Sequence, residues 1–167
     1  CDCDQQMNGK VISSFFHGAK SLWWMSEKQM HKYHDLFPFL LENENFVLSS
    51  VFSKKTLATI KALRESEDVG ATNYWIVLGS KSWIKGTQAA EEWCKSQDPP
   101  NDRYRVVENV PYEEMLHILS FNRGLVYLPP GADTCPRLVI EAKLLRCQLQ
   151  LNDNVLHKDE EWFATDD

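Results

Sequence analysis

The sequence lacks the features that mark membrane proteins, nucleic-acid-binding proteins and disulfide-rich secreted proteins. No apolar run approaches the roughly 20 residues of a membrane-spanning helix, and no signal segment opens the chain. Its 18 Lys and Arg are outnumbered by 24 Asp and Glu, giving a formal charge of −6 that disfavours a nucleic-acid partner. These absences predict a soluble, cytoplasmic protein with no membrane span and no nucleic-acid partner.

Cysteine and glycine are also sparse, and neither follows a diagnostic pattern. The five cysteines are an odd number with no C-x-x-C pair, so the sequence indicates reduced thiols without a metal site. The seven glycines include no G-x-G-x-x-G arrangement, which removes the main support for a dinucleotide-binding fingerprint.

The length predicts one ordinary domain and at most part of a second. The chain has 167 residues, of which 43% are hydrophobic, enough for one core. It begins with Cys1 rather than Met, which favours a fragment or a processed chain. We expect residues 1–45 to be an N-terminal segment and residues 46–167 to be the main domain.

Apolar runs alternate with amphipathic stretches along the main domain. The unbroken apolar run 74–78 is typical of a strand buried on both faces of a parallel sheet. Further strands are predicted at 46–48, 104–107, 125–128 and around 149–151. Ser53 and Thr87 are expected to cap helices whose inward residues include Leu57 and Ala89, and two more helices are expected to begin at Pro111 and Pro136. The alternation indicates a Rossmann-like parallel α/β sheet with helices on both faces. Its ligands would bind at the carboxyl ends of the strands, in the loops after Leu78 and Leu128.

Two carboxylates lie eight positions apart in the segment 131–143. Asp133 precedes the helix expected at Pro136, and Glu141 lies inside that helix among apolar neighbours. A carboxylate in such surroundings is costly unless hydrogen-bond donors satisfy it, and ribose hydroxyls would supply them. The alternative is that Asp133 caps the helix and Glu141 is solvated. Periodicity alone does not distinguish the two interpretations.

The same segment resembles the E-x7-E motif of family-4-like glycosyltransferases of GT-B architecture. That motif has an acid, Gly-Phe-Pro, a few apolar residues and Glu-Ala, and residues 133–142 read DTCPRLVIEA. The first acid is Asp instead of Glu, and the glycine and aromatic are replaced. The resemblance implies that Asp133 contacts the donor sugar and that Glu141 binds the nucleotide ribose, with Thr134 and Pro136 beside the donor.

Residues 79–86 are similar to a second motif of that family, a strand followed by Gly-Arg, a short loop and Lys-Gly. Gly79 keeps the glycine, and Lys85 stands where the family has the lysine that meets the donor diphosphate. Ser80 replaces the arginine. Lys81, next to Ser80, is a possible substitute for the arginine, although a lysine ammonium cannot donate two parallel hydrogen bonds as a guanidinium does. The resemblance assigns Gly79 and Lys81 to donor binding.

The resemblance covers about residues 46–155 and implies one half of a GT-B fold. It implies sugar transfer from a nucleotide-diphosphate sugar to the hydroxyl of a saccharide or other acceptor, with retention and without metal or cofactor. Asp133 and Lys85 would be catalytic. Residues 1–45 would be the remnant of an acceptor domain, completed by a missing N-terminal domain or a second chain, in a pathway of carbohydrate biosynthesis.

Two other functions stay open. A non-catalytic sugar-nucleotide-binding or interaction module is favoured by Ser80 and by the missing acceptor domain. In an unrelated flavodoxin-like or nucleotide-binding regulatory domain, the spacing of Asp133 and Glu141 would be chance.

A few further side chains carry weaker signals. His17 precedes Gly18 and could face the cleft, although such histidines more often pack or cap. His31 and His34 are three positions apart on a predicted helix and lack a third metal ligand, so solvation is the simpler expectation. Three tryptophans beside predicted loops offer ring faces for a sugar or for packing: Trp23, Trp24 and Trp83.

Overall fold

The computed structural model of the chain describes residues 16–97 and 103–165. The chain divides into two compact units, Cys1–Ser50 (unit 1) and Val51–Asp167 (unit 2). The boundary expected from the sequence lay between residues 45 and 46, so the strand expected at 46–48 falls in unit 1. Each unit has its own sheet and its own buried apolar cluster.

Unit 1 is built on a two-stranded parallel sheet. Its elements in chain order are β1 (Ser21–Trp24), α3 (Glu27–Leu36), the 3-10 turn η1 (Pro38–Glu42) and β2 (Glu44–Val47). The Ser26 side chain caps α3 by accepting a hydrogen bond from the backbone N–H of Gln29 at 3.1 Å. Leu22, Trp24 and Leu40 are buried together and form the apolar cluster of this unit.

Unit 2 contains a four-stranded sheet in which every neighbouring pair is parallel. Its strands are β3 (Trp75–Leu78), β4 (Tyr104–Val107), β5 (Gly124–Tyr127) and β6 (Gln148–Leu151), in the spatial order β4-β3-β5-β6. This is the Rossmann-like α/β architecture that the alternating sequence pattern predicted. Four of the five strands expected for the main domain form this sheet, each within one or two residues of its expected position, and the fifth, at 46–48, belongs to the sheet of unit 1.

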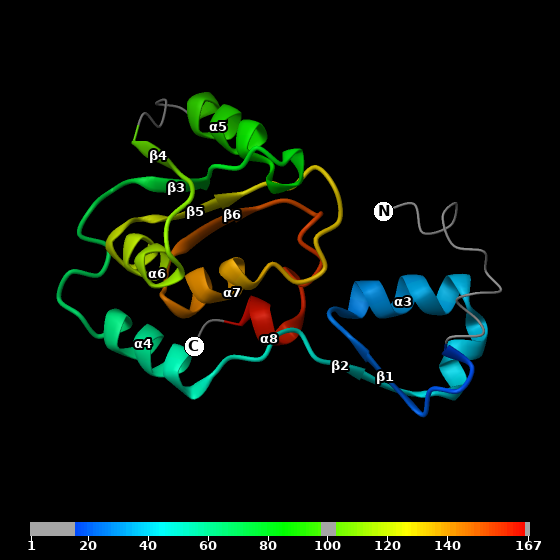
Figure 1. Ribbon diagram of the computed structural model, residues 1–167. Coiled ribbons are helices and arrows are strands. Elements are labelled where there is room, and N and C mark those ends of the chain that lie inside the picture. Colours follow the sequence, from blue (N-terminus) through cyan, green and yellow to red (C-terminus); the bar gives the residue numbers. More distant parts are fainter. Residues whose placement is uncertain (1–15, 98–102, 166–167) are drawn as a thin grey trace. The chain divides into compact units, whose positions relative to one another are not determined.

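Helices cover both faces of this sheet (Figure 1). They are α4 (Lys54–Arg64), α5 (Thr87–Ser96), α6 (Tyr112–Phe121), α7 (Arg137–Leu144) and the short α8 (Glu161–Ala164). Helix α5 lies on one face, and α4, α6 and α7 lie on the other. A 3-10 turn, η2 (Trp83–Lys85), precedes α5. The sequence analysis did not foresee α8.

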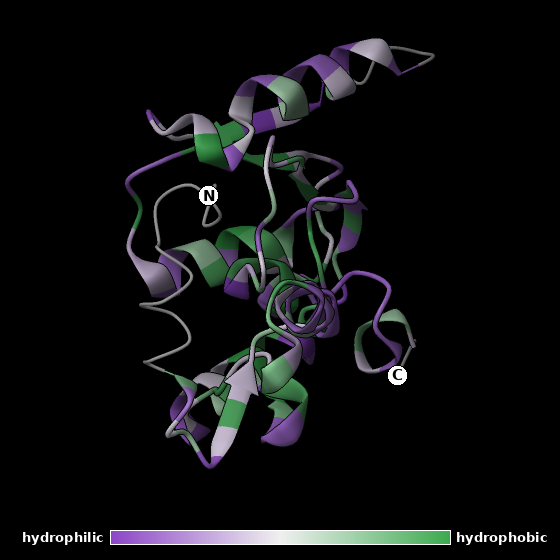
Figure 2. Ribbon diagram, turned by 90° about the vertical axis from the view of Figure 1, so that its right-hand side faces the viewer, coloured by the Kyte–Doolittle hydropathy of each residue, from purple (hydrophilic) through white to green (hydrophobic). Residues whose placement is uncertain are grey.

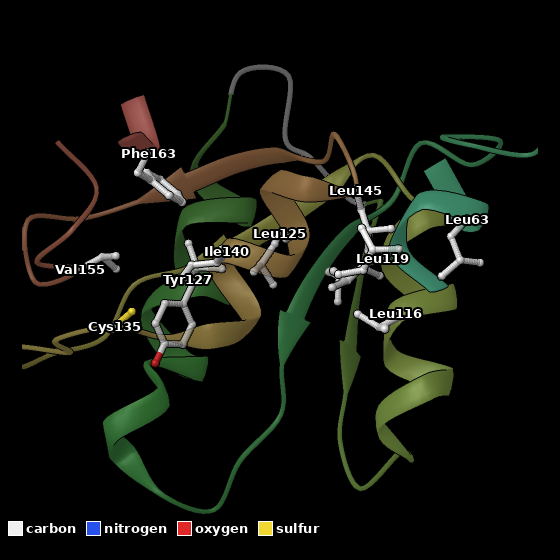
Figure 3. Packing of buried hydrophobic residues seen from close by; sticks show 14 residues of the cluster. Leu63, Leu116, Leu119, Leu125, Tyr127, Cys135, Ile140, Leu145, Val155 and Phe163 are labelled. Carbon is white, nitrogen blue, oxygen red and sulfur yellow. The ribbon is translucent and has the colours of Figure 1, made fainter. Parts of the chain in front are cut away.

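The alternating side chains of the strands divide the core into two apolar clusters. Trp75, Val77 and Val126 face α5, where they meet Ala90 and Cys94. The opposite cluster is larger, and Figure 3 shows ten of its residues labelled. It includes Ile76, Leu125 and Tyr127 from the strands and side chains from α4, α6 and α7. Burial there raises the pKa of the Cys147 thiol to about 12, which keeps it protonated.

The helix starts agree with the sequence in part. Ser53 caps α4 as expected, accepting from the backbone N–H of Thr56 at 3.0 Å. The expected cap Thr87 is wrong: Gly86 is the N-cap of α5, and the Thr87 hydroxyl donates to the carbonyl of Leu78 at 2.6 Å.

Two of the expected inward positions on these helices are also wrong. Leu57 and Ala89 are exposed, because the buried faces of their helices are narrower than the spacing suggested. In Figure 2, α5 at the top of the view carries alternating hydrophilic and hydrophobic colours, as expected for a helix with one buried face.

Gly86 brings the loop after β3 into contact with the loop after β5. Its φ of 66° lies in the left-handed region, which glycine adopts at little cost. A Cβ atom at this position would overlap the carbonyl oxygen of Leu128 and lie 3.0 Å from the backbone nitrogen of Pro129. The two backbones therefore approach as closely as they do only because residue 86 has no side chain.

We expect Gly86→Ala to destabilise unit 2 by more than about 2 kcal/mol, because a left-handed non-glycine residue costs about 1–2 kcal/mol and the overlap with Leu128 adds to it. Urea denaturation of the chain measures the change. Gly131→Ala is the matched control, because a Cβ there meets nothing within 4 Å, and it should stay within about 0.5 kcal/mol of wild type. Equal losses in both variants would contradict the close approach.

Candidate functional site

The candidate site lies where β3 and β5, neighbours in the sheet, end. The chain leaves β3 for α5 on one face of the sheet, and leaves β5 for α7 on the other. Such a switch point creates a crevice at the carboxyl ends of parallel strands, where open α/β sheets bind ligands. The loops that the sequence analysis selected, after Leu78 and Leu128, are the two loops at this point.

Tyr127, the last residue of β5, lies next to both expected catalytic residues, Lys85 and Asp133. The Nζ atom of Lys85 lies 5.8 Å from the centroid of the Tyr127 ring, and the Tyr127 hydroxyl donates to Oδ2 of Asp133 at 2.6 Å. Burial, reinforced by the Asp133 carboxylate, raises the pKa of Tyr127 and keeps the phenol protonated as a donor. A cation and a carboxylate that are 48 residues apart in the chain thus lie beside the same buried tyrosine.

Glu141 is a buried carboxylate, with only 1% of its surface exposed. Its Oε1 atom accepts a hydrogen bond from the hydroxyl of Tyr112 at 2.6 Å and from Nε of Arg137 at 2.9 Å. The Arg137 guanidinium also stacks over the ring of Phe52, 4.8 Å from its centroid. The hydrogen bond with Glu141 raises the pKa of Arg137, so the guanidinium stays charged.

These contacts overturn the alternative interpretation of the two carboxylates. Glu141 is not solvated, and Asp133 does not cap α7, whose N-cap is Pro136. The sequence analysis missed both partners of Glu141. Arg137 could have been found from its i,i+4 spacing, but Tyr112 lies on another helix, 29 residues away, where no local signal identifies it.

The remaining expected donor residues surround the same loops. Gly79 continues the sheet, because its N–H donates to the carbonyl of Val107 at 2.8 Å. Thr134 is half-buried and Pro136 is buried, both in the loop that leads into α7. Lys81 is exposed and lines a hollow of about 730 Å³ on the α5 side of the loop. Lys85, Asp133 and Glu141 do not line that hollow.

His157 is a buried polar residue beside Asp133 that the sequence analysis overlooked. Its ring is fully buried, stacks on Trp162 at 5.4 Å and meets the edge of Phe163 at 4.6 Å. Within the described residues neither ring nitrogen has a hydrogen-bond partner of regular geometry. Burial lowers the pKa of His157, while the carboxylates of Glu160 and Asp133 and the backbone of Thr134 oppose that shift.

The weaker candidates separate into buried and exposed side chains. Trp24 is buried in unit 1, whereas Trp23 and Trp83 are 69% and 73% exposed. His17 is exposed, with its ring 6.4 Å from that of Phe39. His34 lies 3.2 Å from the side-chain oxygen of Asn45, so it is not simply solvated.

No group of three or more His, Cys, Asp or Glu side chains that could hold a metal ion occurs within residues 16–97 and 103–165. Among the helices described, none has the length and apolar character that a membrane crossing requires. Comparisons of the chain with protein-family models, with curated proteins and with solved structures found no match.

The buried imidazole predicts an acid-dependent loss of stability. His157 binds a proton less readily in the folded chain than in the unfolded chain, whose histidine pKa is about 6.5. Its contribution is therefore complete above pH 6.5 and is lost as the pH falls toward the folded pKa. Urea denaturation between pH 7.5 and 5 should show this slope, reduced in His157→Leu and retained in the exposed control His117→Leu. An unchanged slope in His157→Leu would refute the assignment.

Proposed function

We propose that unit 2 is the donor-binding half of a retaining glycosyltransferase of GT-B type, which transfers a sugar from a nucleotide-diphosphate sugar to an acceptor hydroxyl. The observation that carries the proposal is the convergence of Lys85 and Asp133 on Tyr127 at the β3–β5 switch point. The motif resemblance selected these two residues independently of their positions in space. A positive group and a carboxylate at one sheet edge suit a ligand with a diphosphate next to a sugar.

In this proposal, fixed charges and dipoles stabilise the diphosphate. Lys85 supplies an ammonium, and the N-terminus of α7 supplies backbone N–H groups with the positive end of the helix dipole. No side chain caps the Pro136 end of α7. Both features would be most useful as the leaving diphosphate gains negative charge during transfer, which is where stabilisation accelerates a reaction.

The two carboxylates would recognise the sugar and the ribose through their hydroxyls. A carboxylate has about four acceptor positions. The Asp133 carboxylate receives the Tyr127 hydroxyl on Oδ2, which leaves acceptor capacity for a sugar hydroxyl. Glu141 receives two hydrogen bonds on Oε1; one comes from Tyr112, a side chain 44% exposed whose hydroxyl can exchange for that of a ribose.

The proposed transfer breaks the bond between the anomeric carbon and the oxygen of the distal phosphate, whose electron pair leaves with the nucleoside diphosphate. The acceptor oxygen forms the new glycosidic bond on the same face of the sugar. The acceptor proton passes to the departing phosphate oxygen, so that charge and atoms balance.

A second candidate function is sugar-nucleotide binding without transfer. It is favoured by Ser80, which stands where the family has an arginine, and by Lys81, which lines a hollow that Lys85 does not line. The two candidates differ in turnover: release of nucleoside diphosphate in the presence of an acceptor occurs only with the transferase.

The first test is calorimetric titration of the chain, without divalent metal, with UDP, GDP, ADP, dTDP and CDP, and with UDP-glucose, UDP-N-acetylglucosamine, GDP-mannose, ADP-glucose, dTDP-glucose and CDP-glucose. We expect one base to be preferred. Glu141→Gln should weaken the binding free energy of that nucleotide by about 1–3 kcal/mol, because the ribose hydroxyls lose a charged hydrogen-bond acceptor.

Lys85→Ala should weaken the binding of the nucleoside diphosphate but leave the binding of the corresponding nucleoside unchanged, because the nucleoside has no phosphate for the ammonium to contact. Lys54→Ala, an exposed lysine at the start of α4, is the matched control and should bind like wild type. Absence of any nucleotide binding by the wild-type chain, or equal effects of Lys85→Ala and Lys54→Ala, would defeat the proposal.

A further inference from the structure

Two asparagine side chains converge on a single carbonyl group next to the candidate site. The side-chain amides of Asn152 and Asn154, just after β6, donate to the carbonyl oxygen of Pro129 at 2.9 and 2.8 Å. The Asn152 side-chain oxygen in turn accepts from the backbone N–H of Asn154 at 3.1 Å, which fixes the two residues relative to each other. We call Asn152 and Asn154 the asparagine clamp.

The same segment also pairs with the backbone of Asp133. The N–H of Asp133 donates to the carbonyl of Asn154 at 2.8 Å, and the N–H of Leu156 donates to the carbonyl of Asp133 at 3.0 Å. Asp133 and Val155 form an isolated parallel bridge. Figure 3 shows Val155 at the same end of the core cluster as Cys135 and Tyr127. The loop 129–133 is therefore held at its start by side chains and at its end by backbone.

The composition of this loop explains why it needs an external support. Pro129 and Pro130 have no N–H, so the start of the loop has few donors with which to form a turn of its own. The Pro129 carbonyl can accept two hydrogen bonds, and the clamp supplies both. Loss of either amide would leave the loop less well fixed, although the sheet and α7 would remain.

We propose that the asparagine clamp is a positioning device for the donor sugar: it fixes the loop 129–133 so that Asp133 is held against the Tyr127 hydroxyl, ready for the sugar hydroxyls. This inference rests on the proposed function. The hydrogen bonds of the clamp residues go to Pro129 and Asp133, and not to Lys85 or Glu141, which are assigned to the diphosphate and the ribose. The contribution of the clamp should therefore appear in the sugar part of the binding affinity alone.

The experiment separates the sugar from the nucleotide. The sugar increment is the ratio of the dissociation constant of a nucleoside diphosphate to that of its sugar nucleotide, taken for the pair that the wild-type chain binds best in the panel above. Asn154→Asp and Asn152→Asp keep the side-chain shape but place a carboxylate oxygen against the Pro129 carbonyl. We expect the increment to fall about tenfold in each, as for the loss of one well-made hydrogen bond, with the diphosphate affinity unchanged.

Asn122→Asp is the matched control. Asn122 is a buried asparagine of unit 2, whereas Asn152 and Asn154 are half-buried, and its side-chain amide donates to the carbonyl of Ile118 at 2.5 Å, away from the loop 129–133. The same chemical change should lower stability there and leave the sugar increment as in wild type. A purely structural role of the clamp would give the same result in all three variants.

The hydrogen-exchange rate of the Asp133 backbone amide measures how often the loop 129–133 opens. Exchange should accelerate in Asn154→Asp and Asn152→Asp relative to Asn122→Asp at equal global stability. If the wild-type chain binds sugar nucleotides but the clamp variants keep the wild-type increment, the clamp inference is wrong and the proposed function stands. If the wild-type chain binds no nucleotide, the proposed function and the positioning role of the clamp are both overturned. If it binds a nucleoside diphosphate and its sugar nucleotide with equal affinity, the positioning role is overturned.

Discussion

The close backbone approach at Gly86 is the constraint on which the geometry of the candidate site depends. Parallel strands β3 and β5 are neighbours, but the chain leaves them toward opposite faces of the sheet, so their loops would otherwise diverge. Gly86 lets the first loop lie against the backbone of Leu128 in the second. Lys85, one residue earlier, reaches the Tyr127 ring for this reason. A side chain at position 86 would therefore move Lys85 away from Tyr127 and Asp133.

The two carboxylates of the site are stabilised in different ways. Glu141 is buried and is satisfied by a charged partner and a phenol, an arrangement that offsets the large cost of removing a carboxylate from water. Asp133 is only half-buried, and its loop is fixed by hydrogen bonds from the segment after β6. Glu141 is therefore tied to the packing of α6 and α7, whereas Asp133 depends on the hydrogen bonding of a proline-rich loop.

The sequence predicted the elements of unit 2 better than the contacts between them. The run 74–78 and the proline-led helix starts are local signals, so the strands and helices could be placed within a few residues. The assignment of Lys85 and Asp133 to one site was inferred from a motif resemblance and from the rule that ligands bind at the carboxyl ends of parallel strands. Tyr127, Tyr112 and the clamp could not be inferred, because their partners lie 6 to 29 residues away and depend on packing.

The unequal covering of the two sheet faces divides unit 2 into regions of different local stability. Among the described residues, α5 alone covers one face, over a small cluster, while α4, α6 and α7 bury the other. Local opening costs least where few apolar contacts are broken. Detachment of α5 would leave the larger cluster intact while releasing the Lys85 loop. The Lys85 loop can thus open on its own, and a ligand that orders it would bind at a sheet edge whose other loop, that of Asp133, is already fixed.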